Sequence, residues 1–110
     1  MSKSITINWN GSDYTMEFNR KSVVALEGVG FSLNEIVTKP NTMIPLLVQG
    51  AFYMHHPNMK QETAMKIFAD QSDKVGLIGA LREMFVEPTN SLLDEPDEEK
   101  AKNSTWVKSW

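Results

Sequence analysis

The chain has 110 residues, of which 41% are apolar and 23% charged, and this length suits one small domain. A net charge of −3 gives no electrostatic footprint for nucleic acid or an anionic membrane surface, and the absence of cysteine excludes disulfides, thiolate zinc sites and thiol nucleophiles. No signal-peptide stretch opens the chain and no run reaches the roughly 20 apolar residues of a membrane span, so we expect an intracellular protein.

The first expected element is a β-hairpin. Residues 4–9 and 14–18 alternate between apolar and polar side chains, which is the period of a half-buried strand. Asn10 and Gly11 separate the two runs and suit a tight reversal, because both residue types tolerate positive φ. The apolar face would consist of Ile5, Ile7, Trp9, Tyr14, Met16 and Phe18.

A first helix is expected directly after the hairpin. Asn19 is a favourable N-cap, and the helix would continue to Glu27. Gly28 and Gly30 can supply the positive φ that ends a helix. A short second helix over residues 33–38 follows, and we expect Pro40 to stop it. Its start would be a capping box formed by two side chains three residues apart, Ser32 and Glu35.

The most regular apolar stripe lies in the middle of the chain. Thr42 would cap this helix, and Pro45 is tolerated if it lies in the first turn. The helix should stop near His55 and His56, because Pro57 disfavours helical dihedrals in the residue before it. The stripe comprises Met43, Leu46, Leu47, Gly50, Ala51 and Met54.

Two further helices are expected, over residues 60–71 and 73–86. We expect the second to close at Pro88, and we interpret Gly76 and Gly79 as points where a neighbouring helix approaches closely. The side chains expected to face inward are Ala64, Ile67, Phe68, Leu77, Ile78, Leu81, Met84 and Phe85.

These elements predict the fold class and the domain boundaries. The fold should be α+β, with the two-stranded hairpin packed on a bundle of four to five α-helices, all within a single domain over residues 1–93. Residues 94–110 carry an acidic run and little aliphatic content, so they cannot offset the entropy of ordering. We expect a mobile acidic tail there.

No combination of residues predicts catalysis or metal binding. His55 and His56 are the only histidines, and adjacent helical residues point about 100° apart, so they cannot chelate one metal ion together. The dense carboxylate run lies in the expected tail, without the rigid support that acid–base chemistry needs. We therefore expect no enzyme activity, no catalytic, cofactor-binding or metal-binding residues, and no bound cofactor.

Four aromatic residues are the candidate partner-binding residues. Together with Met54, Phe52 and Tyr53 cover much of one helix circumference, so one of them should face a second element or a partner. Trp106 and Trp110 stand in an otherwise polar tail, and exposed aromatic residues often anchor interfaces. A tail that folds back onto its own domain explains the tryptophans equally well.

Read as a whole, the order of these features resembles the small tail assembly chaperones of long-tailed bacteriophages. The resemblance covers about residues 4–106. It rests on the hairpin segments 5–7 and 14–18, the helix 21–27, the segments 39–43 and 49–52, the pair His56-Pro57 and the charged carboxyl tail.

The resemblance implies a non-enzymatic role in the cytoplasm of a host bacterium. Such a chaperone would bind the phage tape measure protein, protect its apolar surface and help to recruit tail tube protein, and it could also form homo-oligomers. No nucleic-acid or membrane partner is expected. The alternative is a small intracellular regulatory or adaptor protein that binds one specific protein partner.

Overall fold

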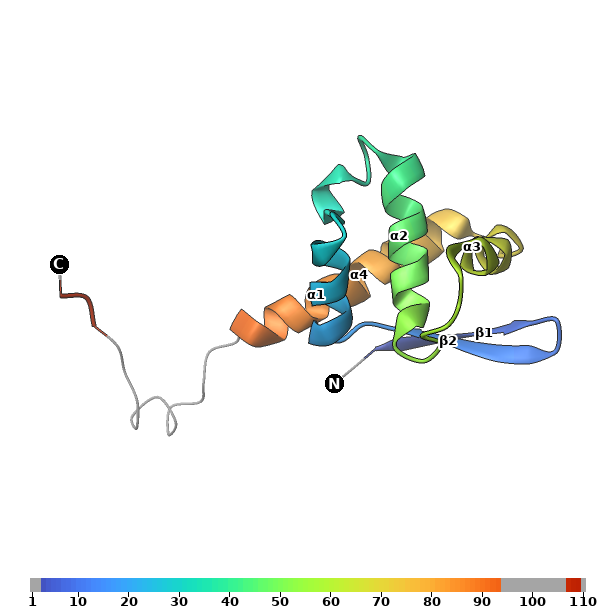
Figure 1. The fold of residues 1–110 in the computed structure, drawn as a ribbon, viewed down its shortest axis with the longest axis horizontal. Coiled ribbons are helices and arrows are strands. Elements are labelled where there is room, and N and C mark those ends of the chain that lie inside the picture. Colours follow the sequence, from blue (N-terminus) through green and yellow to red (C-terminus); the bar gives the residue numbers. More distant parts are fainter. Residues whose placement is uncertain (1–2, 94–106, 110) are drawn as a thin grey trace.

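The computed structural model describes residues 3–93 and 107–109. Within this part of the chain the α+β prediction is confirmed, because an antiparallel two-stranded hairpin precedes four α-helices (Figure 1). Most of the tail expected at 94–110 lies outside the described residues. The elements are β1 (Ser4–Trp9), β2 (Ser12–Glu17), α1 (Arg20–Gly28), the 3₁₀ turn η1 (Leu33–Glu35), α2 (Pro40–Tyr53), α3 (Gln61–Ala69) and α4 (Lys74–Leu93).

The hairpin has the register that its turn dictates. Asn10 and Gly11 have φ values of 52° and 83°, as a two-residue hairpin turn of type I′ requires, and Trp9 pairs with Ser12 beside the turn. The expected apolar face points into the protein, where three of its residues are buried and the other three pack against the core. The buried three are Ile7, Met16 and Phe18.

Both ends of α1 are fixed by local hydrogen bonds. The Asn19 side chain accepts from the backbone N–H of Ser22 at 2.8 Å, and the Ser22 hydroxyl accepts from the Asn19 N–H at 2.9 Å. At the other end the Phe31 N–H donates to the Leu26 carbonyl at 3.0 Å, with Gly30 between them at φ 92°. Gly30 therefore ends the helix, whereas Gly28 is its last helical residue.

Two predicted side-chain caps are wrong, and the short second element, which begins at Leu33 as expected, is a 3₁₀ turn that ends at Glu35 rather than a helix to residue 38. Ser32 makes no side-chain capping bond, because the segment is a 3₁₀ turn in which the Glu35 N–H already donates to the Ser32 carbonyl at 3.0 Å. The next helix, α2, begins at Pro40 rather than after Thr42, since proline suits the first helical position. Pro45 consequently lies in the second turn, where it removes one helical hydrogen bond.

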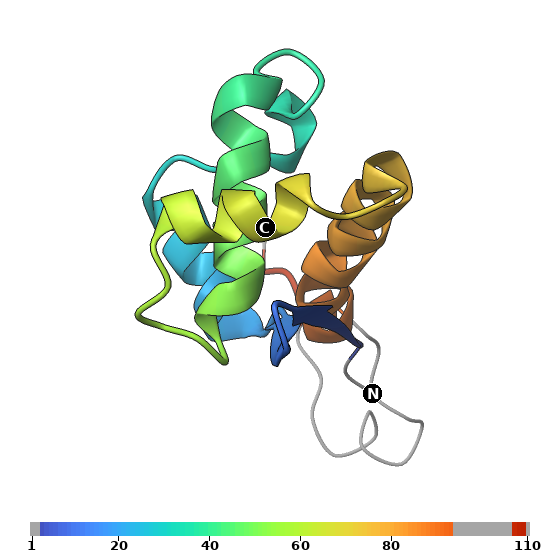
Figure 2. The same ribbon diagram turned by 90° about the vertical axis from the view of Figure 1, so that its right-hand side faces the viewer.

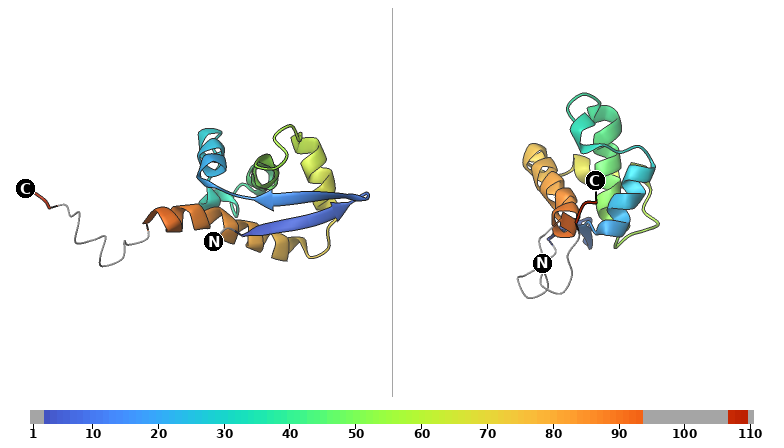
Figure 3. Two further views of the ribbon diagram at one scale, coloured as in Figure 1. Left: turned by 90° about the horizontal axis from the view of Figure 1, so that it is seen from below. Right: turned by 90° about the vertical axis from the view of Figure 1, so that its left-hand side faces the viewer.

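Helix α4 continues through Pro88 to Leu93, so the predicted stop at Pro88 is also wrong. The proline costs the hydrogen bond to the Met84 carbonyl, but the turn before it is held by packing. The ring of Phe85 lies 5.4 Å from that of Phe18 and 5.0 Å from that of Phe31, measured between centroids. The end of α4 extends beyond the other elements (Figures 1 and 3).

The expected roles of the two α4 glycines are not found. A Cβ atom on Gly79 would meet nothing within 4 Å. One on Gly76 would collide with the carboxyl group of Asp73, which accepts from the Gly76 N–H at 3.1 Å. Gly76 therefore makes room for a capping side chain rather than for a neighbouring helix.

Helix α2 is the centre of the molecule. It contacts α1, α3, α4, η1 and β2. The hairpin lies across its carboxyl end and α3 crosses it (Figures 1 to 3). Its side chains supply much of the fully buried core, which includes Leu47, Val48, Ala51 and Phe52. None of the helices in the described ranges combines the length and the apolar character that a membrane span needs.

A candidate partner-binding groove

Phe52 belongs to the core and not to the surface. Its side chain is 0% exposed, and its ring lies 6.3 Å from that of Tyr14 and 6.1 Å from that of His56 between centroids. Tyr14 in turn packs edge-on against Trp9 at 6.1 Å. These rings join the hairpin to the end of α2, so Phe52 has no surface to offer a partner, and the prediction that it binds one is wrong.

Tyr53 is the predicted residue that the structure places at a surface. It is 51% exposed, and Met54 beside it is 40% exposed. Both side chains line a hollow at the amino end of α1. The other two candidates, Trp106 and Trp110, lie outside the described residues.

An open apolar groove runs between α1 and α2. The hollow that both helices line, called the main hollow, measures about 260 Å³, and a second, larger hollow of about 330 Å³ adjoins it at the amino end of α1. The two share Ser22, Ala25, Tyr53 and Pro57. The main hollow is completed by Leu26, Val29, Leu46, Gln49, Gly50, His56 and Met59, and the second by Asn19, Lys21 and Met54.

The floor of the groove forms because α1 and α2 approach closely. A Cβ atom on Gly50 would lie 2.6 Å from Cδ1 of Leu26, so the absence of a side chain there lets α1 lie against α2. The helices run antiparallel (Figure 1), which sets Ser22 near Tyr53 at one end and Val29 near Leu46 at the other.

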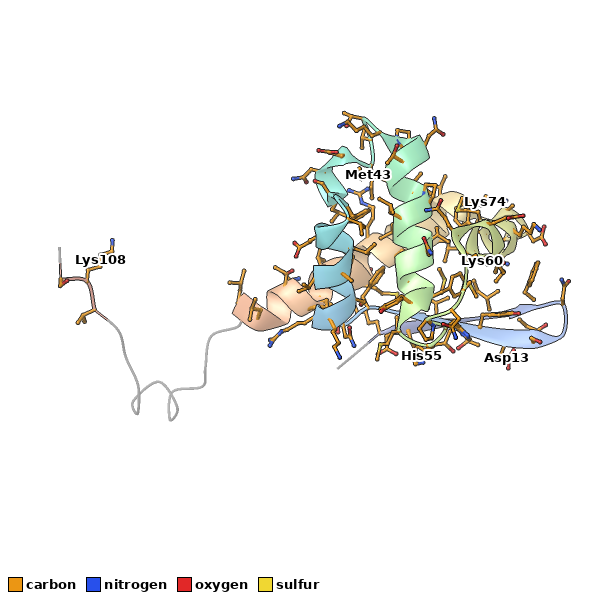
Figure 4. The ribbon with its side chains drawn as sticks, viewed as in Figure 1. Asp13, Met43, His55, Lys60, Lys74 and Lys108 are labelled. Atoms are coloured by element: carbon orange, nitrogen blue, oxygen red, sulfur yellow. The ribbon has the colours of Figure 1, made fainter. Side chains whose placement is uncertain are left out.

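The third wall is the segment after α2, and two histidines fix it to the hairpin. The backbone N–H of Thr15 donates to Nε2 of His56 at 3.1 Å. In the hairpin register Thr15 pairs with Thr6 at a non-hydrogen-bonded position, so this N–H lies on the free edge of β2. His55 contacts the Glu17 carboxylate at 2.9 Å at the carboxyl end of α2 (Figure 4).

The lining of the groove carries little charge. Lys21 is the charged side chain among its lining residues, and no aspartate or glutamate lines it. Elsewhere in the described part of the chain, no group of three metal-ligating side chains could hold a metal ion. The arrangement is suited to taking up apolar side chains of another polypeptide, because it offers exposed aliphatic and aromatic surface with few buried polar groups to satisfy.

Sequence reasoning missed the contribution of α1 to this site. Val29 lines the groove and is 64% exposed, although it follows a helix whose Val23 and Leu26 are buried. The signal was present, because α1 carries more apolar positions than its single buried face can use. The sequence pattern placed Gly50 in the apolar stripe of α2. It did not predict that the missing side chain lets α1 pack closely against α2 at this point.

Comparison with known proteins gives one positive result. No curated protein and no solved structure matches the chain. One family model, DUF5055, described as a domain of unknown function, matches residues 1–110. The chain therefore belongs to the DUF5055 family.

Proposed function

We propose that this protein is a non-enzymatic tail assembly chaperone that binds the tape measure protein of a long-tailed bacteriophage. The observation that carries the proposal is the open apolar groove between α1 and α2. Tyr53 and Val29, at opposite ends of the groove, are each at least half exposed. A groove lined by exposed apolar side chains is suited to the apolar face of a helix from another protein.

The dimensions of the groove favour a helix as the occupant. From Lys21 to Val29 the wall formed by α1 spans eight residue steps, or roughly 12 Å at 1.5 Å per residue. This length accommodates about two turns of a partner helix, which can place apolar side chains at i, i+3, i+4 and i+7.

The choice of client rests on the resemblance to tail assembly chaperones. The hairpin segments and the helix at 21–27, which carry part of that resemblance, correspond to formed elements of the fold. A long helical client would offer many amphipathic stretches, and several chaperone copies along it would gain from avidity. Recruitment of tail tube protein and location in the host cytoplasm belong to the same proposal.

Co-expression with a tape measure protein from the same genome tests the proposal. We expect the client to be soluble and to be retained on the tagged chain, and the double variant V29S/Y53S to lose both effects. The matched control is Val75→Ser, because Val75 is 86% exposed on α4 and does not line the groove. Equal client retention by V29S/Y53S and wild type would contradict the assignment of the site.

Failure of the wild-type chain to retain the client would contradict the tail-assembly function itself. The regulatory or adaptor alternative predicts that outcome, with retention of one different partner encoded elsewhere. Both functions use the same groove, so the identity of the retained protein separates them.

A further inference from the structure

The charge distribution around the groove is one-sided. Lys21 lines the second hollow, next to Asn19 and Met54, and it forms no ion pair with any described residue. Three other lysines are neutralised locally, since each lies within 4 Å of a glutamate carboxylate. These are Lys3, Lys39 and Lys66. Although the protein has a net charge of −3, the lining of this groove holds one lysine and no carboxylate.

Three other polar side chains of the groove, those of Ser22, His56 and Gln49, are engaged in hydrogen bonds within the protein. The Ser22 hydroxyl bonds within the α1 cap, and Nε2 of His56 accepts from Thr15. The Gln49 side chain donates to the Met59 carbonyl at 3.5 Å and accepts from Gln61 at 3.4 Å. The ammonium group of Lys21 is the charged group of the lining, so it is the group that can select among ligands by their charge.

We propose that the groove selects an amphipathic helix of another protein that carries a carboxylate at the end lying over Lys21. The apolar face of about two turns would occupy the main hollow between Val29 and Tyr53, and the carboxylate would meet the ammonium group at the mouth of the second hollow. This inference rests on the proposed function and adds the chemistry by which the client segment is recognised.

Labelled synthetic helices test the selection directly. The probe is an alanine-based peptide of about 16 residues, near the length at which such helices begin to form in water, with leucines at i, i+3, i+4 and i+7. Three versions of the peptide differ in one residue of a terminal turn, which is glutamate, glutamine or lysine. Each version is made twice, once with this residue in the amino-terminal turn and once with it in the carboxyl-terminal turn. Fluorescence anisotropy with the full chain gives the dissociation constants at low and high salt.

We expect the glutamate peptide to bind about two- to fivefold more tightly than its glutamine counterpart at low salt, which is the range for an exposed ion pair, and the difference to fade as salt is added. Lys21→Glu should abolish this preference and favour the lysine peptide. The charge-matched control is Arg82→Glu on α4, outside the groove, which should keep the wild-type order.

Equal affinity of wild type for all three peptides, or no binding of any of them, would overturn the inference. A synthetic peptide of residues 94–110 that displaced the glutamate probe at equal concentration would overturn it too, by showing that the chain supplies its own occupant. The proposed function fails separately, because it requires retention of the tape measure protein and loss of that retention in V29S/Y53S, whatever the charge preference.

Discussion

Phe52 and Tyr53 are adjacent in α2 and face opposite environments. Phe52 is fully buried beneath Tyr14 and His56, whereas Tyr53 is half exposed at the wall of the groove. The last turn of α2 therefore holds the hairpin with one side chain and presents a binding surface with the next. The packing of Phe52 in the core positions Tyr53 beside α1.

This division of roles predicts different outcomes for truncation of the two rings. Phe52→Ala should lower the free energy of unfolding by about 3–5 kcal/mol, because it removes a fully buried ring and leaves a cavity. Tyr53→Ala should cost about 1 kcal/mol or less, in line with exposed sites. Urea unfolding of both variants measures the difference, and equal losses would contradict the assigned roles.

The close approach of α1 and α2 makes Gly50 sensitive to a single methyl group. Gly50→Ala should destabilise the protein by about 1–3 kcal/mol, because the added Cβ atom overlaps the side chain of buried Leu26. Gly79→Ala is the matched control on α4, where the methyl group meets nothing and helix propensity should add about 0.5–1 kcal/mol. Opposite shifts in the urea midpoint are expected.

The two histidines should also differ in their contribution to stability. His56→Ala leaves the Thr15 N–H without its acceptor and removes a ring contact with Tyr14 at 5.2 Å, so we expect a loss of about 1–3 kcal/mol. His55→Ala removes an exposed contact with Glu17 and should cost less than about 1 kcal/mol. Thermal unfolding at one pH compares the two variants. A larger loss of stability for His55→Ala would contradict the assignment of His56 as the main link between the hairpin and the segment after α2.

An ion pair between the start of the chain and α4 should make stability depend on pH. The Lys3 ammonium donates to Glu83 at 2.7 Å; this hydrogen bond lowers the pKa of Glu83 and raises the pKa of Lys3. The contribution of Glu83 is present above the pKa of an unfolded glutamate and is lost as the pH falls through the lowered value. The contribution of Lys3 is lost as the pH rises through the raised value.

The stability difference between wild type and Lys3→Met should therefore be greatest near neutral pH and should shrink in acid and in strong alkali. It should be small throughout and weaken in high salt, since both side chains are more than half exposed. Urea unfolding across this pH range gives the difference. A difference that grew steadily into acid would show that the pair is not its source.

The elements that could be predicted from sequence are those fixed by neighbours along the chain. The hairpin follows from residue alternation around Asn10 and Gly11, and the start of α1 from Asn19, because the groups involved lie within three or four residues of one another. Pro88 misled the prediction because the α4 turn before it is held by Phe85 against two rings distant in sequence. Such tertiary packing outweighs the local preference of proline to end a helix.

The groove was only partly predictable for the same reason. Helical geometry predicts that Phe52 and Tyr53 cannot both face the same core, so one of them should be exposed. Which one is exposed depends on where the hairpin packs. The wall formed by α1 and the lone cation Lys21 in the lining become visible only when α1 and α2 are placed side by side.

Chemical-shift mapping of the labelled chain during titration with the tape measure protein tests the central claim most directly. We predict that the perturbed backbone amides cluster along both walls of the groove, at Ala25, Val29 and Tyr53, while those around Val75 on α4 keep their positions. Perturbations centred on α4, with the amides of the groove unchanged, would contradict the account.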